Sequence, residues 1–570
     1  MKKLSAGMLR LLILLSVLFP VASKAQMELV PVDHKVYPFL EMMSMKGLIN
    51  YNNASIPISR RAVASYLVEL EKVKDKLSKT ERGILADLMV EFSYDIHKNM
   101  DKSYSLLQEF KPDSVLEIFS NDRQKYLATY ADQHLSLFLD GLASLSYRDF
   151  NAESFPKAKV TLAEIGPRFR GTIDNNVGFY LQVTGGQSFG GDTYARSVAA
   201  GYDPVLMAST KFVSSKFINA VSGYLRYETD SHIIALTVGR YNFEMGNGYI
   251  DKLFISDNTP PADLARFDID YKFFKYAFFY GNLQGDSLGV PLASKSIVGH
   301  RLDIEFSPAF RMGIYESLIM TDAPFSFTFL NPVSFIQGVD LLTYSKINNN
   351  ALMGIDCELR PHTNIGIQLS FLVDDLNFAT LTAKNATHDD NKFGYQAGIM
   401  YVDPFGISDL TAILEYTRLD PFVYSHRTNE STYANWGISL GSALPPNSDE
   451  IALELNYYLT NRITLNFLYK HQRSGEGFLD ANGNLTFNDA GVITRNFGGD
   501  VNRGDLDGSF YNTFLMGYRV NRDIFSFSAR IEPVRQYFLD ISYSLQSINK
   551  LYLSKTSIDQ FLYVTASTDF

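Results

Sequence analysis

The stretch IALELNYYLTNRITLNFLYK, residues 451–470, decides the fold class because its apolar side chains recur at every second position. Successive side chains of a β-strand point to opposite faces, so each half of the stretch has one apolar face and one more polar face. The apolar positions are Ile451, Leu453, Leu455 and Tyr457 in the first half and Ile463, Leu465, Phe467 and Tyr469 in the second. Each half is close to the roughly 10 residues that a tilted membrane-spanning strand requires.

The same alternation recurs along most of the chain from about residue 126. It is clear in GHRLDIEF (299–306), in FSFSARIE (525–532) and in LYVTASTDF (562–570), whose final residue is aromatic. A soluble antiparallel sandwich would show the same alternation, but apolar faces rich in Phe, Tyr and Leu favour an outer-membrane barrel. After the first 25 residues, no apolar run approaches the roughly 20 residues of a membrane-spanning helix. We therefore predict an all-β transmembrane barrel.

The first 25 residues have the pattern of a secretory signal peptide. A basic start is followed by an apolar core over residues 9–19 and by the small residues Ser23 and Ala25, which precede a cleavage point at Gln26. Removing this segment leaves 48 Lys and Arg against 62 Asp and Glu, a net charge of −14. This acidic balance argues against binding bulk nucleic acid, which needs a basic surface. We expect a protein exported to the outer membrane through a cleaved signal peptide.

Sequence motifs of enzymes and metal sites are missing. The nine histidines form no HExxH or Cys/His cluster, there is no GxSxG, and the single cysteine, Cys357, excludes an internal disulfide. DANGNLTF (480–487) begins like a calcium loop but lacks the glycine and the glutamate of that motif, so we interpret Asn482-Gly483 as a turn. We predict no catalytic residue, no cofactor and no metal site.

A small helical module precedes the predicted barrel. In SRRAVASYLVELEKV (59–73) the apolar residues recur at spacings of three and four, as on one face of a helix. Ser78 and Glu81 have the spacing of a capping box at the start of the next helix, and a short helix is predicted over residues 38–46, ending at Gly47. We assign residues 1–25 to the signal peptide, 26–120 to the helical module and 121–570 to the barrel.

Charged residues fall on the polar faces of the predicted strands, and inside a barrel they must be paired or hydrated. We expect a network of salt bridges that stiffens and partly fills the barrel. The alternative is a polar surface that binds a hydrophilic ligand. The residues are Arg168, Arg170, Arg226, Glu228, Asp356, Glu358, Arg360, Arg530 and Glu532.

The segment VGRYNFEMGNGYIDKLFISDNTPP, residues 238–261, contains the first two glycines of a dinucleotide-binding motif. Asp251 stands where the third glycine should be and no βαβ pattern surrounds the segment, so the nucleotide interpretation fails. Gly246 and Gly248 instead predict positive φ angles or a close backbone approach at the end of a strand. We interpret VGRYNFEM as a strand that leaves the membrane into a constrained loop.

Several segments, taken in order, resemble the Wzi capsule-assembly family of outer-membrane proteins. They are VPVDHKVYPFLEMMSMKGLI (30–49), PISRRAVASYLVEL (57–70), VGRYNFEMGNGYIDKLFISDNTPPADLARF (238–267), KSIVGHRLDIEFSPAFRMGIYE (295–316), FLNPVSF (329–335), NNALMGIDCELRP (349–361), FGYQAGIMYVDPFGISDLTAILEYTRLDPFVYSH (393–426) and NWGISLGSALPPNSDEIALELNY (435–457). Together they cover most of residues 29–475. Two positions depart from the family pattern: Met245 stands where a Trp is expected, and Pro38 interrupts the first helix.

The resemblance implies a barrel of about eighteen antiparallel strands with the helical module on its periplasmic side. It also implies a lectin-like, non-enzymatic protein that binds capsular or extracellular polysaccharide and helps to attach it to the surface. We expect a monomer surrounded by outer-membrane lipid; a porin-like channel and an outer-membrane hydrolase are the alternatives. The candidate polysaccharide-binding residues are Arg240, Glu244, Asn247, Asp257, Arg266, Tyr424, His426 and Trp436. For each of them, stabilising a strand end or a loop is the alternative role.

Overall fold

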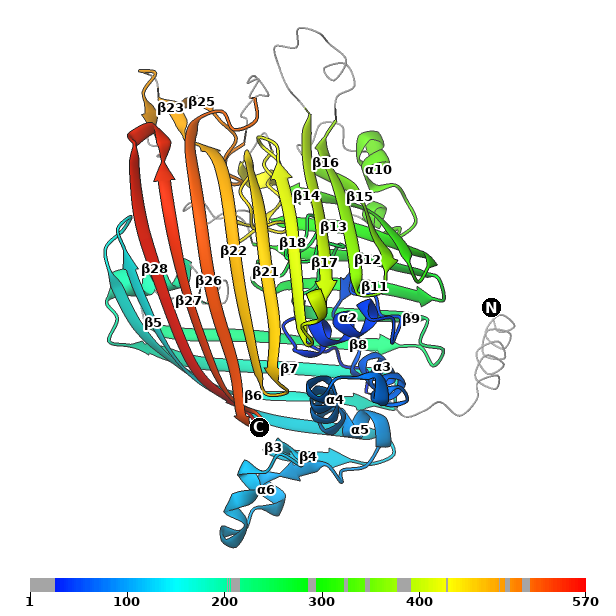
Figure 1. The fold of residues 1–570 in the computed structure, drawn as a ribbon. Coiled ribbons are helices and arrows are strands. Elements are labelled where there is room, and N and C mark those ends of the chain that lie inside the picture. Colours follow the sequence, from blue (N-terminus) through cyan, green and yellow to red (C-terminus); the bar gives the residue numbers. More distant parts are fainter. Residues whose placement is uncertain are drawn as a thin grey trace, which may run out of the picture.

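The computed structural model describes residues 26–201, 203, 206, 216–284, 294–321, 327–343, 349–376, 391–426, 429–480, 482–486, 493–504 and 513–570. These residues form a closed barrel of eighteen antiparallel strands (Figure 1), which confirms the predicted fold class. The strands are β5 (Leu135–Ala152), β6 (Ala158–Ile173), β7 (Val177–Phe189), β8 (Phe217–Glu228), β9 (Ile234–Tyr241), β11 (Ala262–Tyr271), β12 (Phe274–Leu283), β13 (Lys295–Ser307), β14 (Phe310–Thr321), β15 (Asn350–His362), β16 (Ile365–Asp375), β17 (Lys392–Val402), β18 (Leu410–Leu419), β21 (Ser448–Thr460), β22 (Ile463–Glu476), β26 (Tyr518–Val534), β27 (Tyr537–Lys550) and β28 (Lys555–Asp569). β28 closes the barrel against β5, and the short strand β4 (Ala128–Ala131) continues the line of β28 along β5.

The barrel wall carries apolar side chains outward and charged side chains inward. On β21 the side chain of Ile451 is 48% exposed, and on β26 Phe525 and Phe527 are 42% and 46% exposed. On the inner face of β13, Arg301 and Asp303 are buried. This arrangement reverses that of a soluble protein, because the solvent outside the wall is hydrocarbon. The period-two alternation predicted from the sequence therefore separates lipid-facing from interior residues.

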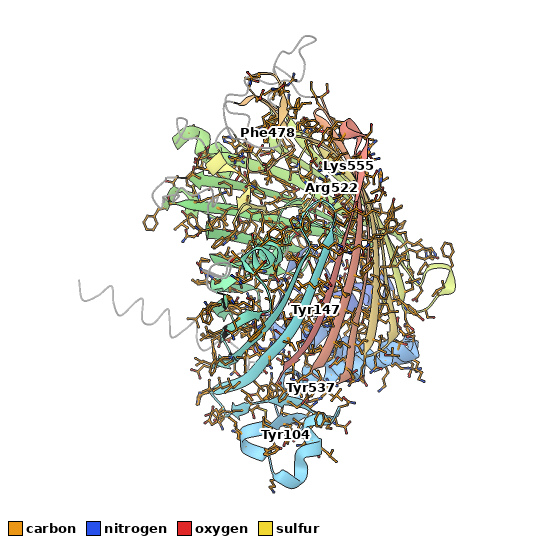
Figure 2. All side chains as sticks on the ribbon, turned by 90° about the vertical axis from the view of Figure 1, so that its left-hand side faces the viewer. Tyr104, Tyr147, Phe478, Arg522, Tyr537 and Lys555 are labelled. Carbon is orange, nitrogen blue, oxygen red and sulfur yellow. The ribbon has the colours of Figure 1, made fainter. Side chains whose placement is uncertain are left out.

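The two ends of the barrel differ in the length of their connections. At the short-turn end, strands are joined by a few residues, such as 363–364 and 535–536, whereas at the long-loop end the connections are as long as 420–447 and 477–517. Figure 2 shows Tyr537 at the short-turn end and Phe478 at the long-loop end. The long connections contain α7 (Thr193–Gly201), β10 (Glu244–Met245), α10 (Ile336–Thr343), β19 (Ala434–Asn435), β20 (Ile438–Ser439), β23 (Phe478–Asp480), β24 (Leu485–Thr486) and β25 (Ile493–Asn496).

A tight turn joins β23 to β24, as predicted for Asn482-Gly483. Gly483 has a φ of 75°, and the backbone N–H of Asn482 donates to the carboxylate of Asp480 at 2.8 Å. The carboxylate thus organises the turn, and the motif that resembles a calcium loop is a β-hairpin.

The N-terminal residues form a group of short elements that includes four α-helices before β2. They are α2 (Val36–Met45), β1 (Ser55–Ile56), α3 (Arg60–Glu71), α4 (Lys79–Glu91), α5 (Ser93–His97), β2 (Ser103–Ser105), α6 (Leu106–Glu109) and β3 (Gln124–Tyr126). The 3₁₀ helices among the residues that the structure describes are η1 (Lys74–Lys76), η2 (Pro112–Phe119), η3 (Phe327–Leu330), η4 (Pro404–Gly406), η5 (Asn429–Ser431) and η6 (Leu551–Leu553). Within the described residues, none of the helices combines the length and apolar character needed to cross a membrane.

The helix boundaries follow the sequence signals with one exception. Ser78 and Glu81 form the predicted capping box at the start of α4. The expectation that Pro38 interrupts the first helix is wrong, because α2 begins at Val36 and Pro38 is its third residue. In the first turn of a helix a proline loses no hydrogen bond, since the N–H groups there have no partner within the helix.

The N-terminal helices fill the short-turn end of the lumen, the interior of the barrel (Figure 1). Their apolar side chains form one core cluster with Met400, Val402 and Ile413 of the wall. Asp87 of α4 also accepts hydrogen bonds from Arg462 and Arg535, both at 2.7 Å, in two turns of the short-turn end. Apolar packing and charged contacts together fix the helices to the wall.

The charges on the inner face form the expected network. Each of the nine charged residues predicted on polar faces has an oppositely charged partner within 4 Å. The pairs are Arg168–Asp140 (2.8 Å), Arg170–Glu28 (3.2 Å), Arg226–Glu228 (3.0 Å), Arg301–Asp356 (2.7 Å), Arg360–Glu358 (3.0 Å), Arg530–Asp540 (3.2 Å) and Lys35–Glu532 (2.8 Å). Glu28 and Lys35 belong to the N-terminal elements, so part of the network joins these elements to the wall.

Arg301 provides the sharpest test of this network. It donates to both oxygens of Asp303 (2.9 and 2.6 Å) and to both oxygens of Asp356 (2.7 and 2.7 Å), and its side chain is fully buried. We expect Arg301→Met to lower the free energy of unfolding by about 3–5 kcal/mol, because two buried carboxylates lose their counter-ion. Urea titration in lipid vesicles measures the change.

Arg240→Ala is the matched control for that experiment, since the side chains of Arg240 and its partner Asp263 are each about half exposed. Removing an exposed pair costs at most about 1 kcal/mol. Equal losses in the two variants would contradict the role given to the buried network.

Candidate functional site

Residues 242–261, here called the inner segment, turn into the lumen after β9. β9 ends at Tyr241, earlier than the predicted strand VGRYNFEM, and β10 then pairs with β1 of the N-terminal elements. The prediction that this segment leaves the membrane into a loop is therefore corrected: the chain folds back inside. Phe254 is fully buried there, with its ring stacked at 4.3 Å on Tyr315 of β14.

The two glycines of the inner segment have the backbone roles predicted for them. Gly246 has a φ of 139°. A Cβ atom on Gly248 would lie 1.7 Å from the carbonyl oxygen of Asp251, so the backbone approaches itself too closely for any side chain. The segment is therefore built around two positions that only glycine fits.

One carboxylate of the wall holds this tight part of the inner segment. Glu415 on β18 accepts hydrogen bonds from the backbone N–H groups of Tyr249 (2.8 Å), Ile250 (3.4 Å) and Asp251 (3.2 Å). Lys252 donates to the carbonyl of Gly248 at 3.2 Å. Three backbone N–H groups directed at one carboxylate resemble an anion-binding site, but here the bound anion is the side chain of Glu415.

Four of the eight predicted binding residues make contacts that hold the inner segment or the wall in place: Glu244, Asn247, Arg266 and Tyr424. Glu244 lies 3.5 Å from Lys252, and burial raises the pKa of its carboxyl while Lys252 opposes the shift. Asn247 is buried and donates to Asp356 at 2.8 Å. Arg266 donates to Asp268 at 2.7 Å and to Ser55 at 2.8 Å.

Tyr424 is fully buried, and its hydroxyl donates to the carbonyl of Leu253 at 2.7 Å. His426, two residues further along the chain, is also buried. Asp257 of the inner segment is exposed. Met245, which replaces the expected Trp, is fully buried and pairs with Ile255 through its backbone. The side chain at this position therefore packs in the interior and presents no surface to a sugar.

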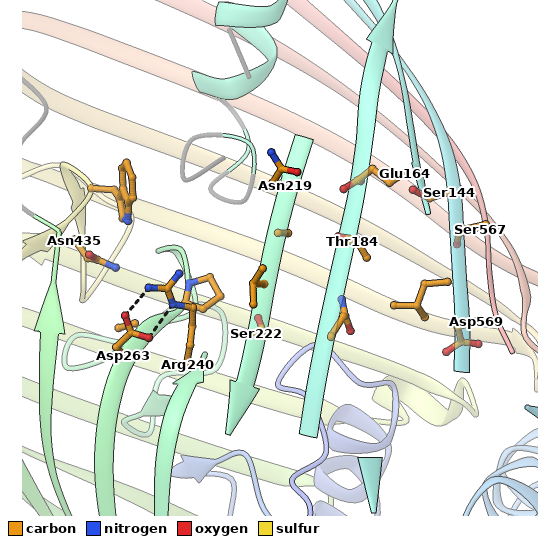
Figure 3. A pocket seen from close by; sticks show the side chains of 18 of the residues that line it. Ser144, Glu164, Thr184, Asn219, Ser222, Arg240, Asp263, Asn435, Ser567 and Asp569 are labelled. Atoms are coloured by element: carbon orange, nitrogen blue, oxygen red, sulfur yellow. Dashed lines mark hydrogen bonds and ion pairs between the residues drawn. The ribbon is translucent and has the colours of Figure 1, made fainter. Parts of the chain in front are cut away.

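Arg240 and Trp436 line the same cavity, although 195 residues of sequence lie between them. The cavity has a volume of about 520 Å³. The Arg240 guanidinium donates to both oxygens of Asp263, at 2.9 and 2.5 Å, which fixes the plane of the cation (Figure 3). Of the eight predicted residues, these two line the cavity.

Asn435 positions the neighbouring tryptophan. Its side-chain oxygen accepts from the backbone N–H of Gln284 at 2.9 Å, and its amide nitrogen donates to the carbonyl of Pro260 at 3.1 Å. The backbone N–H of Trp436 donates to the carbonyl of Gln284 at 3.1 Å, and Trp436 has a φ of 56°. Three separate parts of the long-loop end are thereby joined at the edge of the cavity.

Most of the polar groups in the cavity were not singled out from the sequence. They include Glu164, Gln182, Ser222, Asn282, Gln284 and Asn435. Strand alternation in the sequence places Glu164 and Gln182 on inner faces, so these two residues could have been predicted to face the interior. Asn282 and Gln284 lie at a strand end, where no sequence pattern distinguishes them. Amides and hydroxyls both donate and accept hydrogen bonds, so this lining suits a ligand with many hydroxyl groups.

Comparison with known proteins gives a family match over most of the barrel. The model of the family described as capsule assembly protein Wzi matches residues 158–497. No curated protein sequence matches the chain.

Solved structures share the architecture. The chain resembles Wzi of Escherichia coli, described as an outer-membrane protein involved in group 1 capsule assembly and a carbohydrate-binding β-barrel, with 12% identity, a TM-score of 0.55, and coverage of 94% of this chain and 98% of that one. At this identity the likeness shows the fold alone. OccAB1 of Acinetobacter baumannii (9% identity, TM-score 0.44, coverage 76% and 97%) and OccK2 of Pseudomonas aeruginosa (10%, 0.42, 76% and 98%) are too distant to support an inference.

The anchoring role of Glu415 predicts a local change in backbone protection. In Glu415→Ala the three N–H groups lose a charged acceptor, and hydrogen bonds to charged groups contribute about 1.5–3 kcal/mol each. We expect the amides of residues 249–251 to exchange with deuterium at least about tenfold faster. Exchange followed by mass spectrometry measures this rate.

Glu454→Ala is the control, because Glu454 is also an inward carboxylate but accepts hydrogen bonds from Asn456 and Asn466 of the wall. If residues 249–251 exchange at the same rate in both variants, Glu415 does not hold the inner segment.

Proposed function

The chain belongs to the capsule assembly protein Wzi family, and from this premise we propose that it is a non-enzymatic outer-membrane protein that binds capsular or extracellular polysaccharide. Its role is to hold that polymer at the cell surface. The observation that supports this proposal is the cavity in which Arg240 and Trp436 meet. Arg240 and Trp436 lie at the long-loop end of the cavity, and its lining continues along the inner face of the wall to Asp569 near the short-turn end.

The chemistry of the cavity fits a sugar polymer. Each neutral hydrogen bond contributes only about 0.5–1.5 kcal/mol net, so useful affinity needs several amides and hydroxyls acting on one ligand. The indole of Trp436 adds a flat apolar face with a polar N–H. Arg240 is already paired with Asp263, so the pair offers fixed hydrogen-bond donors and acceptors instead of a free positive charge.

The proposal includes an orientation for the barrel. Outer-membrane barrels have short periplasmic turns and longer extracellular loops. We therefore place the short-turn end and the helical module, residues 26–120, on the periplasmic side, and the part of the cavity lined by Arg240 and Trp436 toward the cell exterior. The signal peptide predicted for residues 1–25 lies outside the described residues. Export by that peptide and a monomeric state are part of the proposal.

Binding of polysaccharide purified from the surface of the native host tests the proposal. We expect Arg240→Ala and Trp436→Ala each to weaken binding about five- to thirtyfold, equivalent to about 1–2 kcal/mol. Arg123→Ala is the matched control, since it removes a similarly exposed Arg–carboxylate pair, with Glu109, outside the cavity. Calorimetric titration of detergent-solubilised protein gives the affinities.

A wild-type protein that binds none of the polysaccharide, or an Arg123→Ala variant as weak as Arg240→Ala, would contradict the proposal. The length distribution of the polymer should be unchanged after prolonged incubation. Shortened polymer would instead favour a hydrolase.

The porin alternative makes a different prediction. Helices and paired charges occupy the short-turn end, so we expect the wild-type protein to give no steady conductance in planar bilayers. Asp87→Ala removes the carboxylate shared by Arg462 and Arg535, and it should give more frequent brief openings because α4 is held less firmly. Large, steady wild-type conductance would favour a diffusion channel.

A further inference from the structure

The outer face of the wall carries a row of charged side chains near the long-loop end. Arg418 of β18, Asp449 of β21 and Arg473 of β22 lie opposite one another on three neighbouring strands (Figure 1). By strand alternation they share the outward face with Leu414 and Ile451, which are exposed to the hydrocarbon. Charged side chains on a lipid-facing surface are costly at mid-depth but tolerated near the membrane interfaces. The row therefore lies at the level of the lipid headgroups.

A third arginine joins this row from the next strand. Arg519 of β26 pairs with Gly475 of β22, two residues beyond Arg473, so the two arginines are diagonal neighbours on the outer face. The Nε of Arg519 donates to the side-chain oxygen of Asn521 at 3.3 Å. None of the described carboxylates lies within 4 Å of the Arg519 guanidinium. Arg519 thus keeps a positive charge that the described part of the chain does not pair.

The charge that this group presents at the surface is positive. We call Arg418, Asp420, Asp449, Arg473 and Arg519 the arginine cluster. Arg473 donates to Asp449 at 2.8 Å, and Arg418 donates to Asp420 at 2.7 Å. The side chains of Arg473 and Arg418 are 42% and 36% exposed, whereas those of Asp449 and Asp420 are 4% and 14% exposed. The aspartates are thus covered, and a molecule that contacts the outer face here meets guanidinium groups.

The next carboxylate on this face has partners of its own. Asp523 of β26 lies opposite His471, one row closer to the middle of the wall. Its Oδ1 lies 2.8 Å from Nδ1 of His471 and accepts a hydrogen bond from the hydroxyl of Tyr469 at 2.9 Å. The guanidinium of Arg519 therefore remains available to an anionic ligand.

An apolar groove with a volume of about 420 Å³ lies on the same face of the wall. Its lining includes two small residues, Cys357 of β15 and Ala397 of β17, and the larger side chains of Phe371, Tyr395 and Tyr416. The three aromatic side chains are exposed on the outer face, so the groove opens toward the hydrocarbon. Small side chains among aromatic rings leave a depression of the size of a small-ligand site.

The groove and the arginine cluster adjoin. The hydroxyl of Tyr416 donates to Asp449 at 3.3 Å, and the Arg418 guanidinium lies 5.8 Å from the centre of the Tyr395 ring. Both tyrosines line the groove. Together, the cluster at headgroup level and the groove that opens to the hydrocarbon match a molecule with an anionic head and an apolar tail.

We propose that this part of the wall binds one phosphorylated lipid of the membrane leaflet at the long-loop end. The arginine cluster holds the headgroup phosphate, because guanidinium groups match phosphate oxygens in a bidentate geometry. One acyl chain of the same lipid lies in the groove. Basic side chains at a membrane surface attract anionic lipids, which favours such a lipid over a neutral one. The lipid site is independent of polysaccharide binding, and under the orientation proposed above its leaflet is the outer one.

Native mass spectrometry of the detergent-solubilised full chain tests the site. The probe is lipid A with two phosphate groups, and the comparison ligand is the same lipid after enzymatic removal of its phosphates. We expect the wild-type protein to bind one molecule of lipid A and to bind the dephosphorylated form at least about fivefold more weakly. Added inorganic phosphate should not release the lipid, because the acyl chain also contributes to binding.

The headgroup contact is tested by Arg519→Gln, which removes a guanidinium without leaving a described aspartate unpaired. We expect this variant to bind lipid A about fivefold more weakly, the contribution of one basic residue near a membrane surface. Lys555→Gln is the matched control, since it removes an exposed cation at the same end of the barrel, on β28 (Figure 2). Its affinity should not change.

The acyl-chain contact is tested by Ala397→Phe, which fills part of the groove with an apolar side chain. We expect lipid A binding to weaken by about fivefold or more, since each CH₂ group that leaves the groove loses buried contact. Ala529→Phe, on the outer face of β26 and outside the groove, should bind like the wild type. Heat-dependent electrophoretic mobility shows whether each variant is folded.

Four results would overturn the inference. Equal affinity for the two forms of lipid A would show that the arginine cluster does not recognise phosphate. Equal weakening in Arg519→Gln and Lys555→Gln would reduce the effect to general charge attraction. Displacement of the lipid by inorganic phosphate, with no effect of Ala397→Phe, would assign the cluster to a free anion. A dimer that Ala397→Phe abolishes would assign the groove to a second copy of the chain.

Discussion

In a lipid bilayer every backbone polar group must find a partner within the protein, and the rest of this structure depends on that constraint. For a chain that crosses with strands it requires a closed wall, and such a wall directs alternate strand side chains into hydrocarbon and into a confined interior. The outer half is therefore apolar. The inner half is charged, and its charges must neutralise one another in a space with little water.

Paired charges connect the parts of the protein as well as satisfying one another. Asp87 contacts two arginines of the short-turn end, Glu28 contacts Arg170 of the wall, and Glu415 accepts three backbone N–H groups of the inner segment. These contacts satisfy buried charges inside the barrel, and they also hold the helices and the inner segment in place. These contacts fill much of the interior, and the cavity proposed to bind polysaccharide lies beside them.

The strands and the first helices were predictable because their signals are local. Alternation at period two marks strands such as 451–459, and the Ser78–Glu81 spacing marks a helix start. The course of the inner segment was not predictable, since a loop that folds inward has the same local sequence pattern as one that projects. Its position depends on contacts with Glu415 and β1, which are distant in sequence. The predicted binding residues separate for the same reason: Arg240 and Trp436 share a cavity, while Asn247 and Tyr424 make contacts inside the barrel.

Closure of the wall joins parts of the chain that are synthesised far apart in time. The hydroxyl of Thr565 on β28 bonds to that of Ser146 on β5 across 419 positions of sequence, and Lys35 before the barrel pairs with Glu532 on β26. The N-terminal elements are synthesised first, but the ion pair of Lys35 can form only after β26 has been made. The seam between β5 and β28 likewise closes only when the last strand is complete.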